Sequence, residues 1–188
     1  EEIGRVTSYR AVFFGVGIVI LNTAYIRAIL TLSLMLCTSL ALAQNYTRGP
    51  VTNLPIPRFV SLKASEGNIR RGPSLSHRID WVLKHRNMPL QVIAEYGHWR
   101  KVQDFEGAGG WIHYSLLSGT RSIVVQVDML NVLNRPKPNA QIQARLERNV
   151  VARLNTCTKE WCEITADGHK GWVNRKLLWG VTLEEKFE

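Results

Sequence analysis

The sequence of 188 residues predicts an all-β protein built from two copies of one small unit, preceded by an apolar helical targeting segment. Three observations support this prediction. An apolar block occupies residues 11–43, the octapeptide GWIHYSLL at 110–117 returns as GWVNRKLL at 171–178, and short β-rich runs alternate with turns after Pro50. A long 3.6-residue period is missing after Pro50, which argues against long helices there.

The targeting segment, residues 1–43, has the features of a secretory signal peptide. Arg27 supplies a positive flank, residues 28–42 form the apolar core, and residues 41–43 read Ala-Leu-Ala, a small-x-small cleavage signal. The core is short for a helix that must cross roughly 30 Å of hydrocarbon. We therefore predict cleavage after Ala43 and a periplasmic or exported product. The alternative is an uncleaved segment that anchors the protein in the inner membrane.

The cysteines and the charge fit export. Of Cys37, Cys157 and Cys162, cleavage after Ala43 removes the first and leaves an even pair, as expected in an oxidising compartment. It also leaves 21 basic and 13 acidic residues, a net charge of +8. A basic protein suits anionic partners, and outside the cytoplasm these are cell-wall polymers or lipid headgroups rather than nucleic acid. Residues 44–58 contain several prolines and predict an extended linker.

The doubled octapeptide belongs to a longer repeat. Trp99 and Trp111 are 12 residues apart, and Trp161 and Trp172 are 11 apart. The preceding proline lies 26 residues before the first tryptophan in one copy and 25 in the other, and the last leucine follows the second tryptophan by 6 in both. Three intervals that agree within one residue predict two copies of one supersecondary unit.

Each copy contains the same series of short strands and turns. The β-rich runs are residues 90–94, 99–102 and 111–113 in the first copy and 149–154, 161–165 and 171–173 in the second. Residues 95–98, with Gly97, separate the first two runs as a turn, and Asp167-Gly168 is a hairpin signal. Several short strands at this spacing predict a small barrel or sandwich.

The order Asn-x-Arg-x-x-Pro, a variable loop, Trp-x-x-Val, a glycine-bearing turn, Gly-Trp-Ile/Val and a final Leu-Leu resembles the bacterial SH3-like domain. More specifically, it resembles the tandem form found in exported proteins of alphaproteobacteria. This resemblance implies two tandem five-stranded SH3-like barrels, at residues 59–123 and 124–183. The second copy departs from the motif, because Leu133 stands where Arg70 stands in the first. If that arginine binds the ligand, the second copy is mainly structural.

Two interpretations apply to the tryptophans at the repeat positions, which are Trp99, Trp111, Trp161 and Trp172. A unit of about 60 residues buries little surface, so these rings are expected to complete the repeat core. Alternatively, a partly exposed aromatic groove binds an extended peptide or glycan, as SH3-type modules bind extended chains. Under the second interpretation the candidate ligand-binding residues are Arg70, Tyr96, Trp99 and Tyr114.

Cys157 and Cys162 bracket a hairpin-sized loop and are predicted to form a structural disulfide. Facing residues of an antiparallel pair lie within disulfide range. A redox-active pair is the alternative, but the four-residue spacing is longer than in thiol oxidoreductase motifs. A zinc site would need two further ligands, and only His169 is close in sequence.

Catalysis is not expected of this chain. The five histidines are scattered, and none is spaced from a cysteine, serine or carboxylate as in a triad or metal site, so we expect no catalytic residue, metal or cofactor. The repeats occupy the sequence and leave no room for a catalytic domain. We expect a non-enzymatic cell-envelope protein that recognises peptidoglycan or an extended peptide of a periplasmic partner. The alternative is a membrane-anchored scaffold or signalling subunit that binds another protein.

Overall fold

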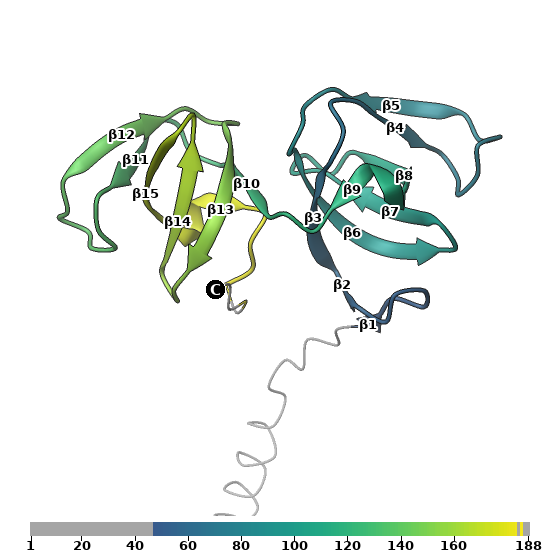
Figure 1. Cartoon of the computed structure of the whole chain (residues 1–188), viewed down its shortest axis with the longest axis horizontal. Coiled ribbons are helices and arrows are strands. Elements are labelled where there is room, and N and C mark those ends of the chain that lie inside the picture. The colour runs from purple at the N-terminus through teal and green to yellow at the C-terminus, as the bar shows by residue number, and fades with distance from the viewer. Residues whose placement is uncertain (1–46, 184, 186–188) are drawn as a thin grey trace, which may run out of the picture. The chain divides into compact units, whose positions relative to one another are not determined.

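The computed structural model describes residues 47–183 and residue 185, which form antiparallel sheets with almost no helix (Figure 1). Residues Tyr46–Glu188 make one compact unit, distinct from Glu1–Asn45. The predicted targeting segment and its cleavage site lie outside the described residues. Within the part that is described, no helix is long and apolar enough to span a membrane.

The first domain is a seven-stranded antiparallel sheet in the order β5-β4-β8-β7-β6-β3-β9. The hairpin β4–β5 lies in the long loop between β3 and β6, and the 3-10 helix η1 precedes β9. The bounds are β3 (Arg58–Leu62), β4 (Gly67–Arg70), β5 (Ile79–Leu83), β6 (Pro89–Tyr96), β7 (Trp99–Gln103), β8 (Gly109–His113), η1 (Tyr114–Leu116) and β9 (Leu117–Ser118).

The second domain repeats this sheet strand for strand, in the order β12-β11-β15-β14-β13-β10-β16. The structure therefore contains the duplication that the tryptophan spacing predicts. The bounds are β10 (Ser122–Val125), β11 (Leu130–Leu133), β12 (Ile142–Leu146), β13 (Val151–Cys157), β14 (Trp161–Ala166), β15 (His169–Asn174), η2 (Arg175–Leu177) and β16 (Leu178–Trp179).

Each sheet has seven strands, where the resemblance implies five. Strands β3, β6, β7, β8 and β9 are the five of the first domain, and the hairpin β4–β5 adds two. β4 pairs with β8 through Arg70 and Trp111, so the hairpin extends the main sheet instead of standing apart as a loop. In the second domain β11 pairs with β15 through Leu133 and Trp172, so the hairpin β11–β12 extends that sheet in the same way.

Strand β10 lies at the predicted boundary between the two domains. The sequence places this boundary between residues 123 and 124, but strand β10 runs through this point. All four residues of Ser122–Val125 are buried, and β10 pairs with β13 and β16 of the second domain. An apolar run of this kind contributes to the core of a β domain, so the whole strand belongs to the second domain.

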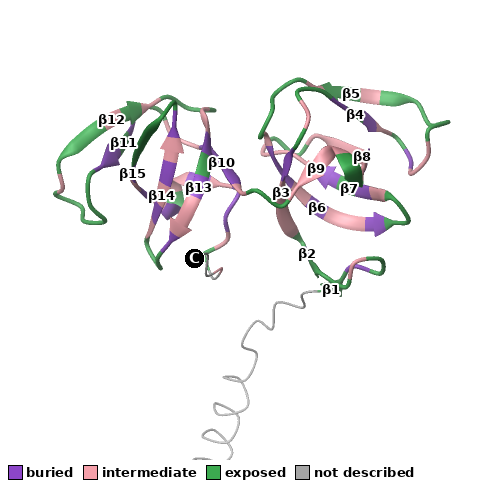
Figure 2. Ribbon diagram, in the orientation of Figure 1, coloured by how far each residue is buried: buried purple, intermediate pink, exposed green. Residues whose placement is uncertain are grey.

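Both domains have a buried interior, drawn in purple in Figure 2. The interior side chains are mainly aliphatic, and the second interior also contains Cys157 and Cys162. In the first domain the buried cluster is Leu62, Ile69, Leu90, Val92, Val102 and Ile112. The four repeat tryptophans are half-buried, which differs from the expectation that they fill the core. The reason is the two-residue period of a strand. Trp111 and Trp172 each precede the residue that points inward, Ile112 and Val173.

The hairpin signal Asp167-Gly168 connects β14 and β15. Both residues have positive φ, 45° and 81°, as the two central positions of a type I′ turn require. Ala166 pairs with His169 across this turn, so a two-residue loop fixes the register of the whole ladder.

The segment predicted as an extended linker has a defined structure from residue 47 onward. β1 (Thr47–Arg48) pairs with β2 (Pro55–Ile56), and the turn between them docks onto the first domain. We call residues 47–56 the N-terminal hairpin. The turn of this hairpin binds the Glu95 side chain, which is fully buried. The Glu95 carboxylate accepts hydrogen bonds from the amides of Val51 and Thr52 at 3.1 and 2.9 Å.

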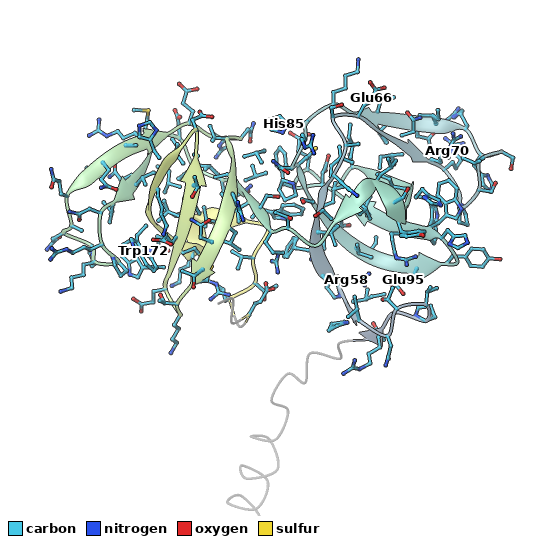
Figure 3. The ribbon with its side chains drawn as sticks, viewed as in Figure 1. Arg58, Glu66, Arg70, His85, Glu95 and Trp172 are labelled. Atoms are coloured by element: carbon cyan, nitrogen blue, oxygen red, sulfur yellow. A yellow bond between two sulfur atoms is a disulfide. The ribbon has the colours of Figure 1, made fainter. Side chains whose placement is uncertain are left out.

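Glu95 is held from two further sides. The Thr52 hydroxyl donates to it at 2.6 Å, and the Arg58 guanidinium forms an ion pair at 2.7 Å (Figure 3). A Cβ atom at Gly49 would lie 2.3 Å from a Glu95 carboxylate oxygen, so only glycine allows this close approach. The N-terminal hairpin is therefore fixed by a buried carboxylate that the sequence alone does not mark.

Candidate ligand-binding surface

The tight connection between β6 and β7 builds the candidate site. β6 continues through Tyr96, and β7 begins at Trp99, with which Tyr96 pairs. The turn is therefore reduced to Gly97-His98, and Gly97 adopts a positive φ of 49°. Because strand pairing extends to the turn, Tyr96 and Trp99 lie opposite each other at the end of the hairpin.

Four aromatic rings gather beside this turn. His113, the last residue of β8, pairs with Trp99, and its ring meets the Trp99 ring edge-on at a centroid distance of 5.6 Å. Tyr114, the first residue of η1, lies 4.9 Å from His113 and 5.6 Å from His98. His98 and His113 are 5.9 Å apart. We call His98, Trp99, His113 and Tyr114 the ring cluster.

Buried Arg100 supports the ring cluster. Its guanidinium donates to the carbonyls of Gly97 and Trp99 at 2.9 and 2.8 Å, which fixes the turn. The same group lies 5.8 Å from the centroid of the Tyr114 ring and 3.5 Å from Glu95. Arg100 thus joins the carboxylate that holds the N-terminal hairpin to an aromatic ring of the candidate surface.

The surface is partly open to solvent. Tyr96 is 65% exposed and Tyr114 is 49% exposed, whereas Trp99 is half-buried. Exposed tyrosine rings beside a supported tryptophan offer flat apolar faces with polar edges, the kind of surface that contacts elongated ligands.

The structure gathers three of the four predicted binding residues. Tyr96, Trp99 and Tyr114 lie at this hairpin end. Arg70 has other partners: its guanidinium donates to the carbonyls of Leu75 and His77 at 2.9 and 2.7 Å. It closes the tip of the loop between β4 and β5, which gives it a structural role there.

Sequence reasoning missed His98, His113 and Arg100. A usable signal was present for the histidines, because each stands directly beside a predicted aromatic residue, Trp99 or Tyr114. Arg100 had no such signal, since a charged residue on a short strand is ordinarily solvent-exposed.

The second domain keeps the tryptophan but not the ring cluster. Trp161 corresponds to Trp99, while Asn174 and Arg175 take the places of His113 and Tyr114 at the start of the 3-10 helix. Its surface is instead hollowed into a groove of about 350 Å³. The groove is lined in part by Met129, Leu133, Pro138, Trp161, Asn174 and Leu177.

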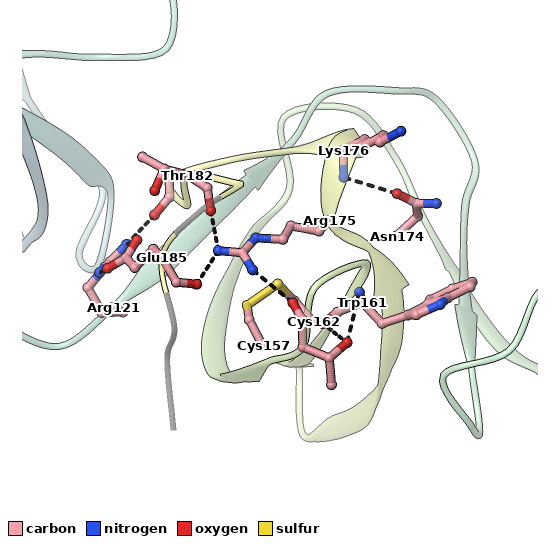
Figure 4. The surroundings of a disulfide bond; sticks show 11 residues. Arg121, Cys157, Trp161, Cys162, Asn174, Arg175, Lys176, Thr182 and Glu185 are labelled. Atoms are coloured by element: carbon pink, nitrogen blue, oxygen red, sulfur yellow. Dashed lines mark hydrogen bonds and ion pairs between the residues drawn. A yellow bond between two sulfur atoms is a disulfide. The ribbon is translucent and has the colours of Figure 1, made fainter. Parts of the chain in front are cut away.

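Cys157 and Cys162 form the disulfide that the sequence predicts (Figure 4). They face each other across β13 and β14, at the register that Glu95 and Arg100 occupy in the first domain. The duplicated hairpin is therefore closed by an ion pair in one copy and by a covalent bond in the other. Nearby, buried Arg175 donates to the Thr158 carbonyl at 2.8 Å.

Removing this disulfide is expected to destabilise the second domain by about 2 kcal/mol, because a short loop loses its entropic constraint in the unfolded chain. For a domain of this size the loss corresponds to roughly 10 °C in Tm. Calorimetry of a Cys157→Ala/Cys162→Ala variant measures it, and reduction of the unchanged protein should give the same shift. An unchanged Tm would contradict a stabilising role.

Among the described residues, no group of three or more histidine, cysteine, aspartate or glutamate side chains is arranged to hold a metal ion. The two histidines of the ring cluster contact aromatic rings, and His113 Nδ1 shares a hydrogen bond of 2.7 Å with the Ser115 hydroxyl.

The family model for the bacterial SH3 domain matches this chain twice, over residues 63–119 and 126–180, together more than half of its length. The chain belongs to the bacterial SH3 domain family. The two matches begin just after β3 and β10 and end just after β9 and β16, so they select equivalent parts of the two SH3 domains.

Solved structures similar to this chain include NlpC2 and NlpC1 from Trichomonas vaginalis. NlpC2 shares 14% identity at a TM-score of 0.31, over 65% of this chain and 48% of its own. NlpC1 shares 13% identity at a TM-score of 0.32, over 70% of this chain and 48% of its own. The present chain thus spans about half the length of these proteins. A search of curated proteins found no significant match.

Proposed function

We propose that the protein is an exported, non-enzymatic binding protein of the cell envelope, and that its first SH3 domain binds peptidoglycan through the ring cluster and Tyr96. The observation that carries this proposal is the ring cluster itself, four aromatic rings in which neighbouring centroids lie 4.9–5.9 Å apart, beside the turn between β6 and β7. Membership of the bacterial SH3 family supports a cell-wall-related binding role.

Three further features support this choice of ligand and domain. A glycan strand or stem peptide is elongated, and exposed rings on one surface offer it successive apolar contacts. The net charge of +8 after residue 43 favours approach to an anionic polymer. We choose the first domain because the second lacks two of the rings: Asn174 and Arg175 occupy the positions of His113 and Tyr114.

Co-sedimentation with intact peptidoglycan sacculi tests the proposal, using residues 44–188, which include the whole compact unit. Binding is expected to persist from low to moderate salt, because aromatic contacts are not screened by ions. Binding that disappears as salt is added would reflect only the attraction of a basic protein to an anionic polymer. If the protein does not bind sacculi but cross-links to another protein in cells, the alternative function as an envelope scaffold is supported instead.

Export has its own test. If the signal peptide is cleaved as proposed, N-terminal sequencing of protein isolated from cells gives Gln44 as the first residue, and the protein is released with the periplasmic fraction. Protein that retains residues 28–43 and stays with the membrane fraction would contradict export and favour the anchored alternative.

A further inference from the structure

The first domain contains a groove between strand β5 and the turn that joins β7 to β8. Its volume is about 200 Å³. The core residues Ile69 and Val102 are among those that line it, Trp81 and Val82 belong to β5, and Asp104 and Glu106 belong to the turn. We call this the β5 groove. Its lining shares no residue with the ring cluster.

β5 is the terminal strand of its sheet, and no described strand pairs with its outer edge. Three of its apolar side chains are open to solvent: Ile79 is 41% exposed, Trp81 is 55% exposed and Val82 is 42% exposed (Figure 2). An unpaired edge with exposed apolar residues is a template for pairing with another chain, and proteins usually protect it with lysine, proline or other charges.

The duplication shows that the fold does not require this exposed apolar surface. In the second domain, β12 occupies the equivalent edge, with Ala144 paired to Val132 as Trp81 is paired to Ile69. Arg145 stands in the place of Val82. The second domain therefore has a small residue and a cation where the first has two large apolar residues, although both domains form the same sheet.

The charges at the β5 groove are anionic, in contrast to the basic chain as a whole. Asp104 and Glu106 line it, and its described lining contains no lysine or arginine. The Asp104 carboxylate is held in place by the amides of Glu106 and Ala108, at 3.0 and 2.9 Å. Asp80 of β5 is already engaged by Arg71 and Arg78.

We propose that the β5 groove binds an extended basic peptide of a partner protein, which adds a strand to the outer edge of β5. An apolar side chain of the peptide packs on Trp81, which lies on the same face of the sheet as its partner Ile69, while a lysine or arginine side chain reaches Asp104 and Glu106. Main-chain hydrogen bonds supply affinity in this mode, and alternate side chains supply specificity. This site is independent of the proposed peptidoglycan surface.

A fluorescein-labelled peptide of seven alternating valine and lysine residues tests the proposal by fluorescence anisotropy, with residues 44–188 as receptor. Trp81→Ala is expected to weaken binding at least 10-fold, because aromatic anchors dominate such interfaces. Val82→Arg should weaken it similarly. Ile142→Ala, on the equivalent edge of the second domain, should leave binding unchanged. Trp81→Ala is expected to fold, since Ala144 fills the equivalent position, and its thermal transition verifies this.

Two altered peptides separate the contributions. Replacing lysine with glutamate should abolish binding, and N-methylation of alternate amides should do the same by removing the strand hydrogen bonds. The proposal is overturned if the valine–lysine peptide does not bind, if Trp81→Ala binds it equally well, or if either altered peptide binds as tightly. Loss of sacculus binding in Trp81→Ala would also overturn it, by assigning this groove to the wall polymer, whereas unchanged sacculus binding is expected.

Discussion

Replacing Glu95 with glutamine is expected to destabilise the first SH3 domain by about 3 kcal/mol and to release the N-terminal hairpin. Burial of the carboxylate would by itself raise its pKa, but hydrogen bonds from Thr52, Arg58 and Val51 outweigh this effect and lower the pKa to about 2. Since the ordinary value is 4.5, the preference of the folded state for the ionised form is worth about 3 kcal/mol.

The same pKa sets the pH dependence of stability. Because the pKa of Glu95 is lower in the folded state than in the unfolded chain, protonation favours unfolding. The contribution is complete above about pH 5 and is lost as the pH falls toward 2. The wild-type protein should therefore lose more stability over this interval than the Glu95→Gln variant, which lacks the titrating group.

Urea denaturation measures the free energy of unfolding, and trypsin cleavage after Arg48 or Arg58 reports release of the hairpin. The matched control is Glu163→Gln in the second domain. Its partner Lys170 is 60% exposed, so less than about 1 kcal/mol should be lost. Equal effects of the two substitutions, or an unchanged cleavage rate in Glu95→Gln, would show that the buried carboxylate does not fix the hairpin.

Replacing Trp99 with alanine is expected to weaken binding to peptidoglycan about 30-fold, equivalent to about 2 kcal/mol. Trp99 pairs with Tyr96 on one strand and with His113 on another, so it is the ring that connects the exposed tyrosine to the rest of the cluster. Binding isotherms with sacculi give the dissociation constant. Calorimetry must show that the first domain still folds, since Trp99 is half-buried.

Sacculus binding by a Tyr114→Ala variant tests the same surface at a second ring. Tyr114 is 49% exposed and contacts two histidine rings, so its removal should weaken sacculus binding with little effect on stability. A loss of binding in Trp99→Ala without any loss in Tyr114→Ala would place the ligand elsewhere on the hairpin and contradict the extended aromatic surface.

The sequence was informative where residue type and spacing coincide. The intervals between proline, tryptophan and leucine predicted the duplication, and a five-residue separation predicted the Cys157–Cys162 disulfide. Glu95 shows why the rest was not predictable. It was assigned to a turn, whereas β6 extends one residue beyond it to Tyr96. Its partners Val51 and Thr52 lie more than 40 positions away, and two of the contacts use backbone amides, which leave no pattern in sequence.

In the candidate site, too, some features were predictable from local sequence and others depended on long-range contacts. Tyr96, Trp99 and Tyr114 were chosen as aromatic residues near turns, and strand pairing brings them to one end of the domain. Arg70 was chosen from a motif, but its hydrogen bonds to loop carbonyls depend on how the loop between β4 and β5 closes. Local residue type located the rings, while long-range packing determined the role of each charge.

The most direct test of the account compares the two equivalent tryptophans in one experiment. Wild-type protein, Trp99→Ala and Trp161→Ala are sedimented with intact sacculi at moderate salt. We predict that Trp99→Ala stays largely in the supernatant, while Trp161→Ala pellets with the wild type. If Trp161→Ala alone loses binding, the wall ligand occupies the groove of the second domain, and the assignment of peptidoglycan recognition to the ring cluster is contradicted.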